Sequence, residues 1–334
     1  MSPALAATLP RLLLSPLGYD DSMLSSATIV FFSGTGGTAR CAYAIKQSLE
    51  SLSVAVSLYE LRKDNTSSPS LDADLLVMMY PVFMFDAPFP VYRFLAQLPL
   101  SNGKRVAIIP VSGGGEIFPN RACRYMVSKR LEQKGYEVIY EDMLMMPSNT
   151  IIPTGKNASI GLLKVLQATS KALASSQNAK SNKLLSKCDE IAHNMATEAR
   201  QRIYAPHVDR IFARLSGFEK GAVGLKGFGE RIQASSACNS CGWCVRGCPQ
   251  NNITLEEGAS TPSFSSSCAL CLKCIYGCPE HALSPGTGAF LVLKEGYSLD
   301  ALEELGAPDR SRFNKELKGV AWKDIRRYLD DYLP

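Results

Sequence analysis

The sequence predicts an α/β protein: a five-stranded parallel sheet with flanking helices, followed by a small α+β unit built around cysteines. From Ala27 to about residue 150, apolar runs bounded by loop residues alternate with stretches of helical period, a pattern typical of a parallel sheet covered by helices. Eight of the eleven cysteines then fall between Cys238 and Cys278. The other three are expected to pack as small hydrophobic residues; they are Cys41, Cys123 and Cys188.

The first unit is expected to contain five strands, each an apolar run bounded by loop residues. We place these strands at Ala27–Phe32, Val54–Glu60, Ala73–Tyr80, Val106–Val111 and Tyr136–Asp142. Stretches of helical period between them predict helices at Thr38–Ser51, Pro90–Ala96 and Arg121–Gln133. The last of these helices ends at Lys134-Gly135, a typical stop signal. Residues 27–150 are therefore expected to form one sheet-containing domain.

At 334 residues the chain is long enough for two compact units and further segments that connect or extend them. Residues 1–26 carry a short leucine run and two prolines, and we expect a disordered extension in which Met1 or Met23 is the start. Residues 151–237 hold 13 Lys and Arg against 6 Asp and Glu, and they predict a basic helical connector. Residues 287–334 predict a helical extension without recognisable chemistry.

The cysteines of residues 238–286 form two runs of the same design. In each run two residues separate the first cysteine from the second and the second from the third, and three residues separate the third from the fourth. A proline follows the fourth cysteine directly. The runs are Cys238, Cys241, Cys244 and Cys248 with Pro249, and Cys268, Cys271, Cys274 and Cys278 with Pro279. This doubled unit resembles the bacterial two-cluster ferredoxin fold. The resemblance implies two [4Fe-4S] clusters.

The spacing of the cysteines has a physical reason in such a unit. Three thiolates two residues apart wrap one loop around three irons of a cube, while the fourth points away to the other cube. One cluster is therefore expected to bind Cys238, Cys241, Cys244 and Cys278, and the other to bind Cys268, Cys271, Cys274 and Cys248. Zinc is an alternative, although zinc sites normally use two separated Cys-x-x-Cys pairs. Clusters with a purely structural purpose are a second alternative.

A loop rich in hydroxyls and glycine stands between the first expected strand and the first expected helix. It reads Ser33, Gly34, Thr35, Gly36, Gly37 and Thr38. A dianionic phosphate at this helix N-terminus would gain from the free backbone amides and the helix dipole. The loop lacks the Gly-Lys-Ser/Thr end of a P-loop and the last glycine of the dinucleotide fingerprint.

This loop is similar to the phosphate loop of flavodoxins. Ser33, Thr35 and Thr38 stand at its three hydroxyl positions, and Gly37 replaces an asparagine that is frequent there. The resemblance implies FMN as a cofactor. Two further segments would then hold the isoalloxazine ring, at the carboxyl ends of the third and fourth strands.

These two ring segments are Tyr80, Pro81, Val82 and Phe83, and Ser112, Gly113, Gly114 and Gly115. The aromatic side chains are candidates for stacking on the ring, and the glycine amides are candidates for reaching its edge. Each aromatic also reads as an ordinary core residue, and the glycine run as a simple loop. Asp86 and Glu116 are the charged groups next to these segments, and neither predicts a catalytic acid.

The order of the parts resembles a family of flavodoxin-ferredoxin fusions over residues 27–285. The resemblance implies an intracellular electron-transfer protein that passes electrons between FMN and the clusters, to or from a protein redox donor or acceptor. One alternative is a flavin-dependent reductase of a small substrate, fed by its own ferredoxin domain. Another is a binding or assembly module whose cofactors are structural remnants.

Charge and composition argue against two classes of partner. The formal net charge is +5, but two clusters with their thiolates lower it to about +1 and FMN to about −1, so the electrostatic motive for nucleic-acid binding is lost. No run reaches the ~18 apolar residues of a membrane span. We expect a cytoplasmic protein, or one in a reducing organelle lumen if residues 1–26 are a transit peptide. The identity of the redox partner and the oligomeric state stay open.

Overall fold

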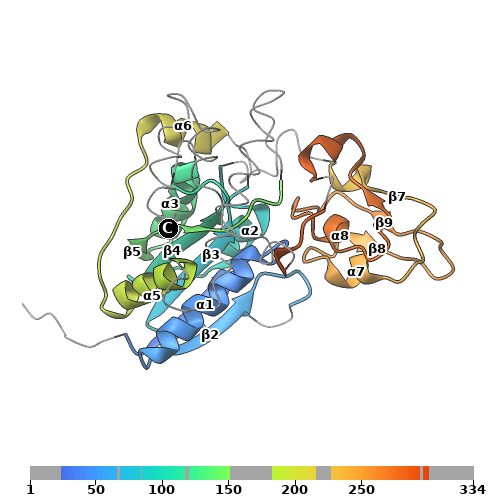
Figure 1. Cartoon of the computed structure of the whole chain (residues 1–334). Coiled ribbons are helices and arrows are strands. Elements are labelled where there is room, and N and C mark those ends of the chain that lie inside the picture. Colours follow the sequence, from blue (N-terminus) through green and yellow to red (C-terminus); the bar gives the residue numbers. More distant parts are fainter. Residues whose placement is uncertain are drawn as a thin grey trace, which may run out of the picture.

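The computed structural model describes residues 24–65, 68–83, 85–116, 120–150, 183–215, 227–293 and 296–300. These residues form two bodies that lie side by side (Figure 1). We call the described residues between 24 and 215 the sheet unit, and residues 227–293 the cysteine unit.

Five parallel strands build the sheet unit: β1 (Ser26–Phe31), β2 (Ala55–Glu60), β3 (Leu75–Pro81), β4 (Arg105–Ser112) and β5 (Glu137–Glu141). Their spatial order is β2-β1-β3-β4-β5, and a short strand, β6 (Leu144–Met145), pairs in parallel with the last residues of β4. This is the order of flavodoxin-like doubly wound sheets. The five expected strands are confirmed to within two residues at each end.

The burial of the strands follows their place in the sheet. Strands β3 and β4 lie in its middle and are buried almost throughout, which explains their unbroken apolar sequences. Strand β2 lies at the edge and has no fully buried residue. The register is parallel throughout, so the carboxyl ends of β1, β3 and β4 lie at one edge of the sheet.

Helices cover both faces of the sheet. Helices α1 (Gly37–Ser51) and α5 (Lys183–Ala196) share one core with the strands, and α2 (Phe89–Gln97) and α3 (Tyr125–Gln133) share the other. A 3-10 helix, η1 (Asn120–Arg124), precedes α3 and takes up the start of the helix expected over 121–133. Within the described ranges, no helix is both long and apolar enough to cross a bilayer.

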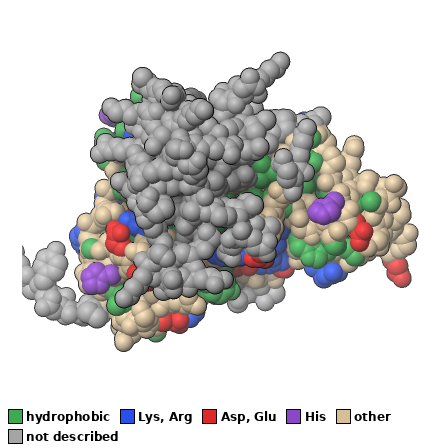
Figure 2. All heavy atoms as spheres, in the orientation of Figure 1, with side chains coloured by type: hydrophobic (Ala, Val, Ile, Leu, Met, Phe, Trp, Pro, Cys, Tyr) green, Lys and Arg blue, Asp and Glu red, His purple; other side chains and the backbone are tan. Residues whose placement is uncertain are grey.

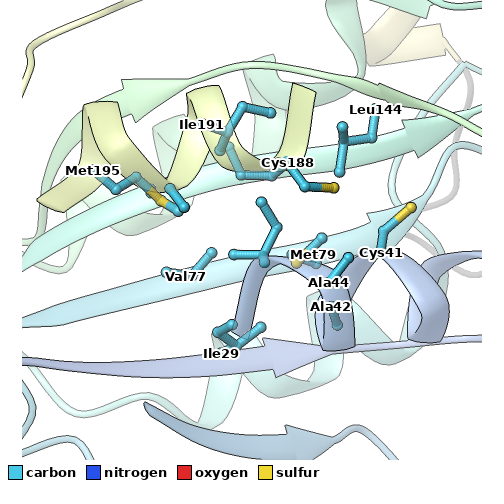
Figure 3. Close-up of a cluster of buried hydrophobic side chains, with 14 of the residues drawn as sticks. Ile29, Cys41, Ala42, Ala44, Val77, Met79, Leu144, Cys188, Ile191 and Met195 are labelled. Carbon is cyan, nitrogen blue, oxygen red and sulfur yellow. The ribbon is translucent and has the colours of Figure 1, made fainter. Parts of the chain in front are cut away.

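Helix α5 belongs to the sheet unit, although the sequence predicts a connector there. Leu184, Cys188, Ile191 and Met195 are buried in the same core as α1 and the sheet. Figure 3 shows Cys188, Ile191 and Met195 of α5 turned toward Cys41 and Ala44 of α1 and toward strand residues such as Val77. The expected connector therefore contains part of the sheet unit's core.

The next segment also packs on the sheet unit. Gln201 forms a parallel bridge with Tyr140 of β5. Helix α6 (His207–Leu215) follows, and the side chain of its Asp209 is buried in an ion pair with Arg121 of η1. The first part of the expected connector, residues 151–182, lies outside the described residues, as do residues 1–23 and 301–334 of the two expected extensions.

The cysteine unit has short elements arranged as a repeat. Strand β7 (Gln233–Ala234) pairs antiparallel with β10 (Leu283–Ser284), and β8 (Ile253–Thr254) pairs antiparallel with β9 (Ser263–Phe264). Helices α7 (Trp243–Gly247) and α8 (Lys273–Tyr276) occupy equivalent places in the two cysteine runs. Two 3-10 turns, η3 (Gly229–Arg231) and η4 (Gly286–Leu291), flank the repeat.

Candidate cofactor sites

Two hollows in the cysteine unit are each lined by four cysteines. Site one, a hollow partly open to solvent, is lined by Cys238, Cys241, Cys244 and Cys278. Site two, also partly open, is lined by Cys248, Cys268, Cys271 and Cys274. In each case three cysteines come from one run and the fourth from the other. This is the grouping that the spacing predicts, and the role of these cysteines as metal ligands stays a prediction.

The backbone around the cysteines repeats along with the sequence. Left-handed conformations occur in pairs exactly thirty residues apart: Ser240 and Leu270, Gly242 and Leu272, and Asn251 and His281. Such conformations cost a non-glycine residue roughly 1–3 kcal/mol and cluster at functional sites, where the surroundings hold them in place. Here they turn each chain segment around its hollow.

Backbone amides point at three of the cysteine sulfurs. The N–H of Asn252 donates to Sγ of Cys248, and that of Ala282 donates to Sγ of Cys278, both at 3.4 Å. The N–H of Leu270 donates to Sγ of Cys268, also at 3.4 Å. The first two bonds are again equivalent in the repeat. Hydrogen bonds to thiolate sulfur stabilise its negative charge and tune the potential of a cluster that it binds.

The two sites differ in burial. Cys248 and Cys271 of site two are buried, whereas Cys241 of site one is exposed. Burial raises the pKa of the Cys268 thiol to about 11 and that of the Cys271 thiol to about 12. Burial therefore favours the neutral thiol over the thiolate at these two positions.

Within the described part of the chain, no group of three or more His, Cys, Asp or Glu side chains is placed to hold a metal ion. The two sites are thus identified by the residues that line the hollows and by the repeat. A set of four cysteine thiols is the donor set that [4Fe-4S] clusters use, so the residues fit this group.

The phosphate loop lies at the carboxyl end of β1 and leads into α1. Gly36 stands at the N-cap of α1 with φ of 101°, a conformation that favours glycine, and it has no side chain with which to cap the helix. Ser33 Oγ accepts the N–H of Ala39 at 3.2 Å, and Thr38 is buried. The loop thus combines hydroxyls with a helix N-terminus, as a phosphate requires.

The two expected ring segments lie at the same sheet edge. Val82 N–H donates to the Val111 carbonyl at 2.9 Å, which holds the ends of β3 and β4 together. Phe83 packs edge-on against Phe32 with ring centroids 6.5 Å apart. Tyr80 is fully buried, and its hydroxyl donates to the Cys123 carbonyl. Pro81 ends β3, between these two aromatic positions.

Side chains of η1 hold the segment after β4 in place. Ser112 Oγ accepts from the N–H of Gly114 at 3.1 Å and from Asn120 Nδ2 at 2.9 Å, and Asn120 Nδ2 also donates to the Gly115 carbonyl. Glu116 forms a two-fold ion pair with the buried Arg124, at 2.5 and 2.9 Å. The backbone from Ser112 to Glu116 is therefore fixed by residues of η1.

Both charged groups beside the ring segments have structural partners. Asp86 is buried and accepts the Tyr92 hydroxyl at 2.6 Å and the N–H of Ala87 at 2.8 Å. Glu116 pairs with Arg124 as described. Both carboxylates hold local structure, and the expectation that neither is a catalytic acid stays a prediction.

Site two adjoins the phosphate loop. A Cβ atom on Gly34 would lie 2.8 Å from both the Cβ atom and the carbonyl oxygen of Cys271. Ala269 and Cys271 share a hydrophobic core with Phe32 and Tyr80 of the sheet unit. The cysteine unit is therefore seated on the sheet edge where the three loops meet.

Three residues that the sequence analysis did not single out join the two units. Asn149 Nδ2 donates to Thr35 Oγ1 at 3.0 Å and to the Cys271 carbonyl at 3.3 Å. The Tyr276 hydroxyl donates to the Asn149 carbonyl at 2.6 Å. Tyr297 packs on Tyr276 and donates to the Pro147 carbonyl at 2.8 Å. Of these, only Tyr276 lies in a recognisable motif.

Asn149 and Tyr297 each form a hydrogen bond with Thr35 of the phosphate loop. Leu299 is close to Gly36 of the same loop. For FMN to bind, the side chains of Asn149 and Tyr297 must line the phosphate or move aside. The donor chemistry of the loop fits a phosphate, because free amides and hydroxyls converge there.

Comparisons with known proteins add the following. No family model matches the chain, and no curated protein matches it. Among solved structures, it is similar to an archaeal flavodoxin at 18% identity, over 51% of this chain and 96% of that one, with a TM-score of 0.32. It is also similar to a flavodoxin of Streptococcus pneumoniae TIGR4 at 18% identity, over 51% of this chain and 99% of that one, with a TM-score of 0.33. Oxidised Flavodoxin 2 of Bacillus cereus matches at 17% identity, over 52% of this chain and 97% of that one, with a TM-score of 0.34. The strand order, rather than these scores, identifies the flavodoxin-like fold of the sheet unit.

Proposed function

We propose that this chain is an electron-transfer protein. It carries FMN at the loops that end β1, β3 and β4, and one [4Fe-4S] cluster at each of sites one and two. It exchanges electrons with a protein partner. No disulfide joins any of the eleven cysteines, all of which lie in described residues, and this suits a reducing compartment such as the cytoplasm.

The observation that carries the proposal is the lining of the two hollows. Each contains three cysteines of one run and the fourth cysteine of the other, within a backbone that repeats every thirty residues. Four thiolates in this exchanged arrangement suit a pair of iron-sulfur cubes. The backbone N–H groups of Asn252 and Ala282 donate to the sulfurs of Cys248 and Cys278, and these bonds would stabilise the negative charge of the thiolates.

The flavin part of the proposal rests on where the loops meet. In open α/β sheets, ligands bind outside the carboxyl ends of the strands, where the strand order reverses. In this sheet that point lies between β1 and β3, next to Ser33 and Val82. Bound FMN would supply the exchange between two-electron and one-electron chemistry, which the clusters lack. The chain would hold the phosphate at Ser33–Thr38 and the ring between the segments after β3 and β4.

The test is anaerobic purification of the full chain, followed by iron, acid-labile sulfide, zinc and flavin analysis and a redox titration. We expect about eight irons, about eight sulfides and one FMN per chain. Zinc in place of iron would reject the cluster proposal, and clusters without flavin would reject the FMN proposal alone. A loaded protein that is redox-silent would reject electron transfer.

The same purified protein also distinguishes the reductase alternative from the proposed electron-transfer function. Steady turnover of a small acceptor without any protein partner would favour it. Among the described residues beside the ring segments, the acidic side chains are Asp86 and Glu116, and both hold local structure.

A further inference from the structure

We propose that the two cysteine sites have different places in the electron path. Site two is the inner relay beside the flavin loops, and site one is the outer terminal, where a basic one-electron carrier protein docks. This inference rests on the proposed function, because it requires clusters at both sites.

Site two lies on the side of the cysteine unit that packs on the sheet unit. Cys271 packs on Gly34 and lies in the core that contains Phe32. The segment after Cys248 is held by two hydrogen bonds across the boundary: the Lys63 N–H donates to the Pro249 carbonyl, and Arg93 Nη1 donates to Gln250 Oε1, both at 2.8 Å. A group held by the four cysteines of site two would therefore lie on the side of the cysteine unit that faces the phosphate loop.

Site one faces the other way. Cys241 is the one exposed cysteine among its lining residues and among all eleven of the chain. Its neighbours Asn239 and Glu280 are also exposed. In Figure 1 the loops of the cysteine unit around β8 and β9 lie on its side away from the sheet. A partner can approach a cluster at site one without displacing any part of the sheet unit.

The rim of site one is acidic. Glu280 accepts from Asn239 at 3.0 Å, and the turn from Glu256 to Ala259 adjoins Ser240, whose hydroxyl donates to the Ser260 carbonyl at 2.7 Å. Glu256 and Glu257 in this turn are exposed. Figure 2 shows acidic side chains toward the outer end of the cysteine unit in that view.

One basic side chain also lies at this rim, since Arg246 Nη1 donates to the Cys241 carbonyl at 3.0 Å. Three glutamates against one arginine leave the rim negative, and the thiolate-bound cluster adds further negative charge. Arg62 of the sheet unit donates to the Arg246 carbonyl, but its guanidinium is paired with Asp64. Beside site two, the basic Arg93 of the sheet unit donates to Gln250. Complementary charge raises the rate and the affinity of association, so the outer face suits a partner with a basic contact surface.

The two sets of cysteines would hold groups that exchange one electron at a time. Cys248, Cys268, Cys271 and Cys274 would hold the group beside the flavin loops, and Cys238, Cys241, Cys244 and Cys278 would hold the group that faces the partner. In each exchange the donor would be oxidised by one electron and the acceptor reduced by one, in either direction, and the ferric haem of cytochrome c could serve as the final acceptor.

The order of the sites is tested on the loaded full chain, after iron and flavin analysis. The protein is treated with EDTA and ferricyanide in the presence of iodoacetamide, and mass spectrometry follows the alkylation of each cysteine. We expect Cys238, Cys241, Cys244 and Cys278 to be alkylated together, about tenfold faster than the other four, because reactivity follows exposure. Faster labelling of the site-two cysteines, or equal labelling of all eight, would overturn the order and leave the proposed function intact. Absence of iron before treatment would reject both.

The docking face is tested with cytochrome c, a basic one-electron carrier, as the probe. Binding is measured calorimetrically at low salt for Glu257→Lys and for a matched control, Asp72→Lys, which makes the same charge change on an exposed residue of the sheet unit. We expect Glu257→Lys to weaken binding about fivefold and Asp72→Lys to leave it within about twofold. Equal effects of the two variants would overturn the docking face, as would no effect of either.

Discussion

Gly34 and Cys271 meet at the boundary between the two units, where a Cβ atom on Gly34 would lie 2.8 Å from both the Cβ atom and the carbonyl oxygen of Cys271. The phosphate loop and a proposed cluster ligand are therefore in direct contact. Any side chain at position 34 must push the two units apart or distort the loop.

We therefore expect Gly34→Ala to destabilise the protein by about 1–3 kcal/mol, the usual cost of overpacking. It should lower both flavin content and iron content, because the contact is shared. The control is Gly37→Ala in the same loop, where the new Cβ atom would meet Met146 side-chain atoms at 3.4 Å, an ordinary contact. Thermal unfolding with cofactor analysis compares the two, and identical behaviour would contradict the role of the contact.

A second glycine pair lies inside the cysteine unit. Gly247 and Gly277 stand at equivalent positions of the repeat, each before the fourth cysteine of its run. A Cβ atom on Gly277 would overlap the ring of Trp243, whereas one on Gly247 would lie 3.4 Å from that ring. We expect Gly277→Ala to reduce iron content strongly and Gly247→Ala to reduce it little. Iron and sulfide analysis of both variants checks this, and equal loss would show that the repeat, rather than Trp243, sets the requirement.

The strands were predictable because β3 and β4 are buried on both faces, which leaves a continuous apolar run in the sequence. Helix α5 was harder. Leu184, Cys188 and Ile191 form an apolar stripe of helical spacing, but such a stripe does not say which surface it covers. The Ser- and Lys-rich composition around it favoured a connector, and the core contact with α1 became visible only in three dimensions.

The grouping of the eight cysteines around two hollows was predictable from their spacing, because the spacing is local and repeated. Their role as metal ligands stays a prediction. The contacts between the units were not. Asn149 and Tyr276 are joined by one hydrogen bond across 127 residues of sequence. A single polar contact between two loops leaves no periodic pattern, so neither residue could be singled out. The position of Cys271 against Gly34 was hidden for the same reason.

The ion pair between Glu116 and Arg124 supports the loop after β4. The Arg124 side chain is 2% exposed, and among the described residues its Nε is the one buried side-chain nitrogen or oxygen without a hydrogen-bond partner. We expect Glu116→Ala to cost about 3–5 kcal/mol, because it leaves a buried charge unpaired. Flavin affinity should fall as well, since the loop from Ser112 would lose its support.

The control for Glu116→Ala is Glu137→Ala, which breaks the exposed pair of Glu137 with Arg200. Exposed pairs contribute about 0–1 kcal/mol, so this variant should unfold nearly as the parent does. Denaturant unfolding and flavin titration measure both variants. A similar small loss for the two would mean that water reaches Arg124 once Glu116 is removed.

The last prediction separates the two cysteine sites through the flavin. Cys241 is exposed and belongs to site one, whereas Cys271 is buried against the phosphate loop and belongs to site two. We expect Cys241→Ser to lose one cluster and to bind FMN as the parent does. Cys271→Ser should lose the other cluster and also weaken FMN binding, because the loop at Gly34 and Thr35 loses the ordered segment that Asn149 ties to it. Visible absorption, iron analysis and flavin titration distinguish the variants. Equal flavin affinity in both would show that the phosphate loop keeps its shape without an ordered site two, and equal loss would show that the units do not fold independently.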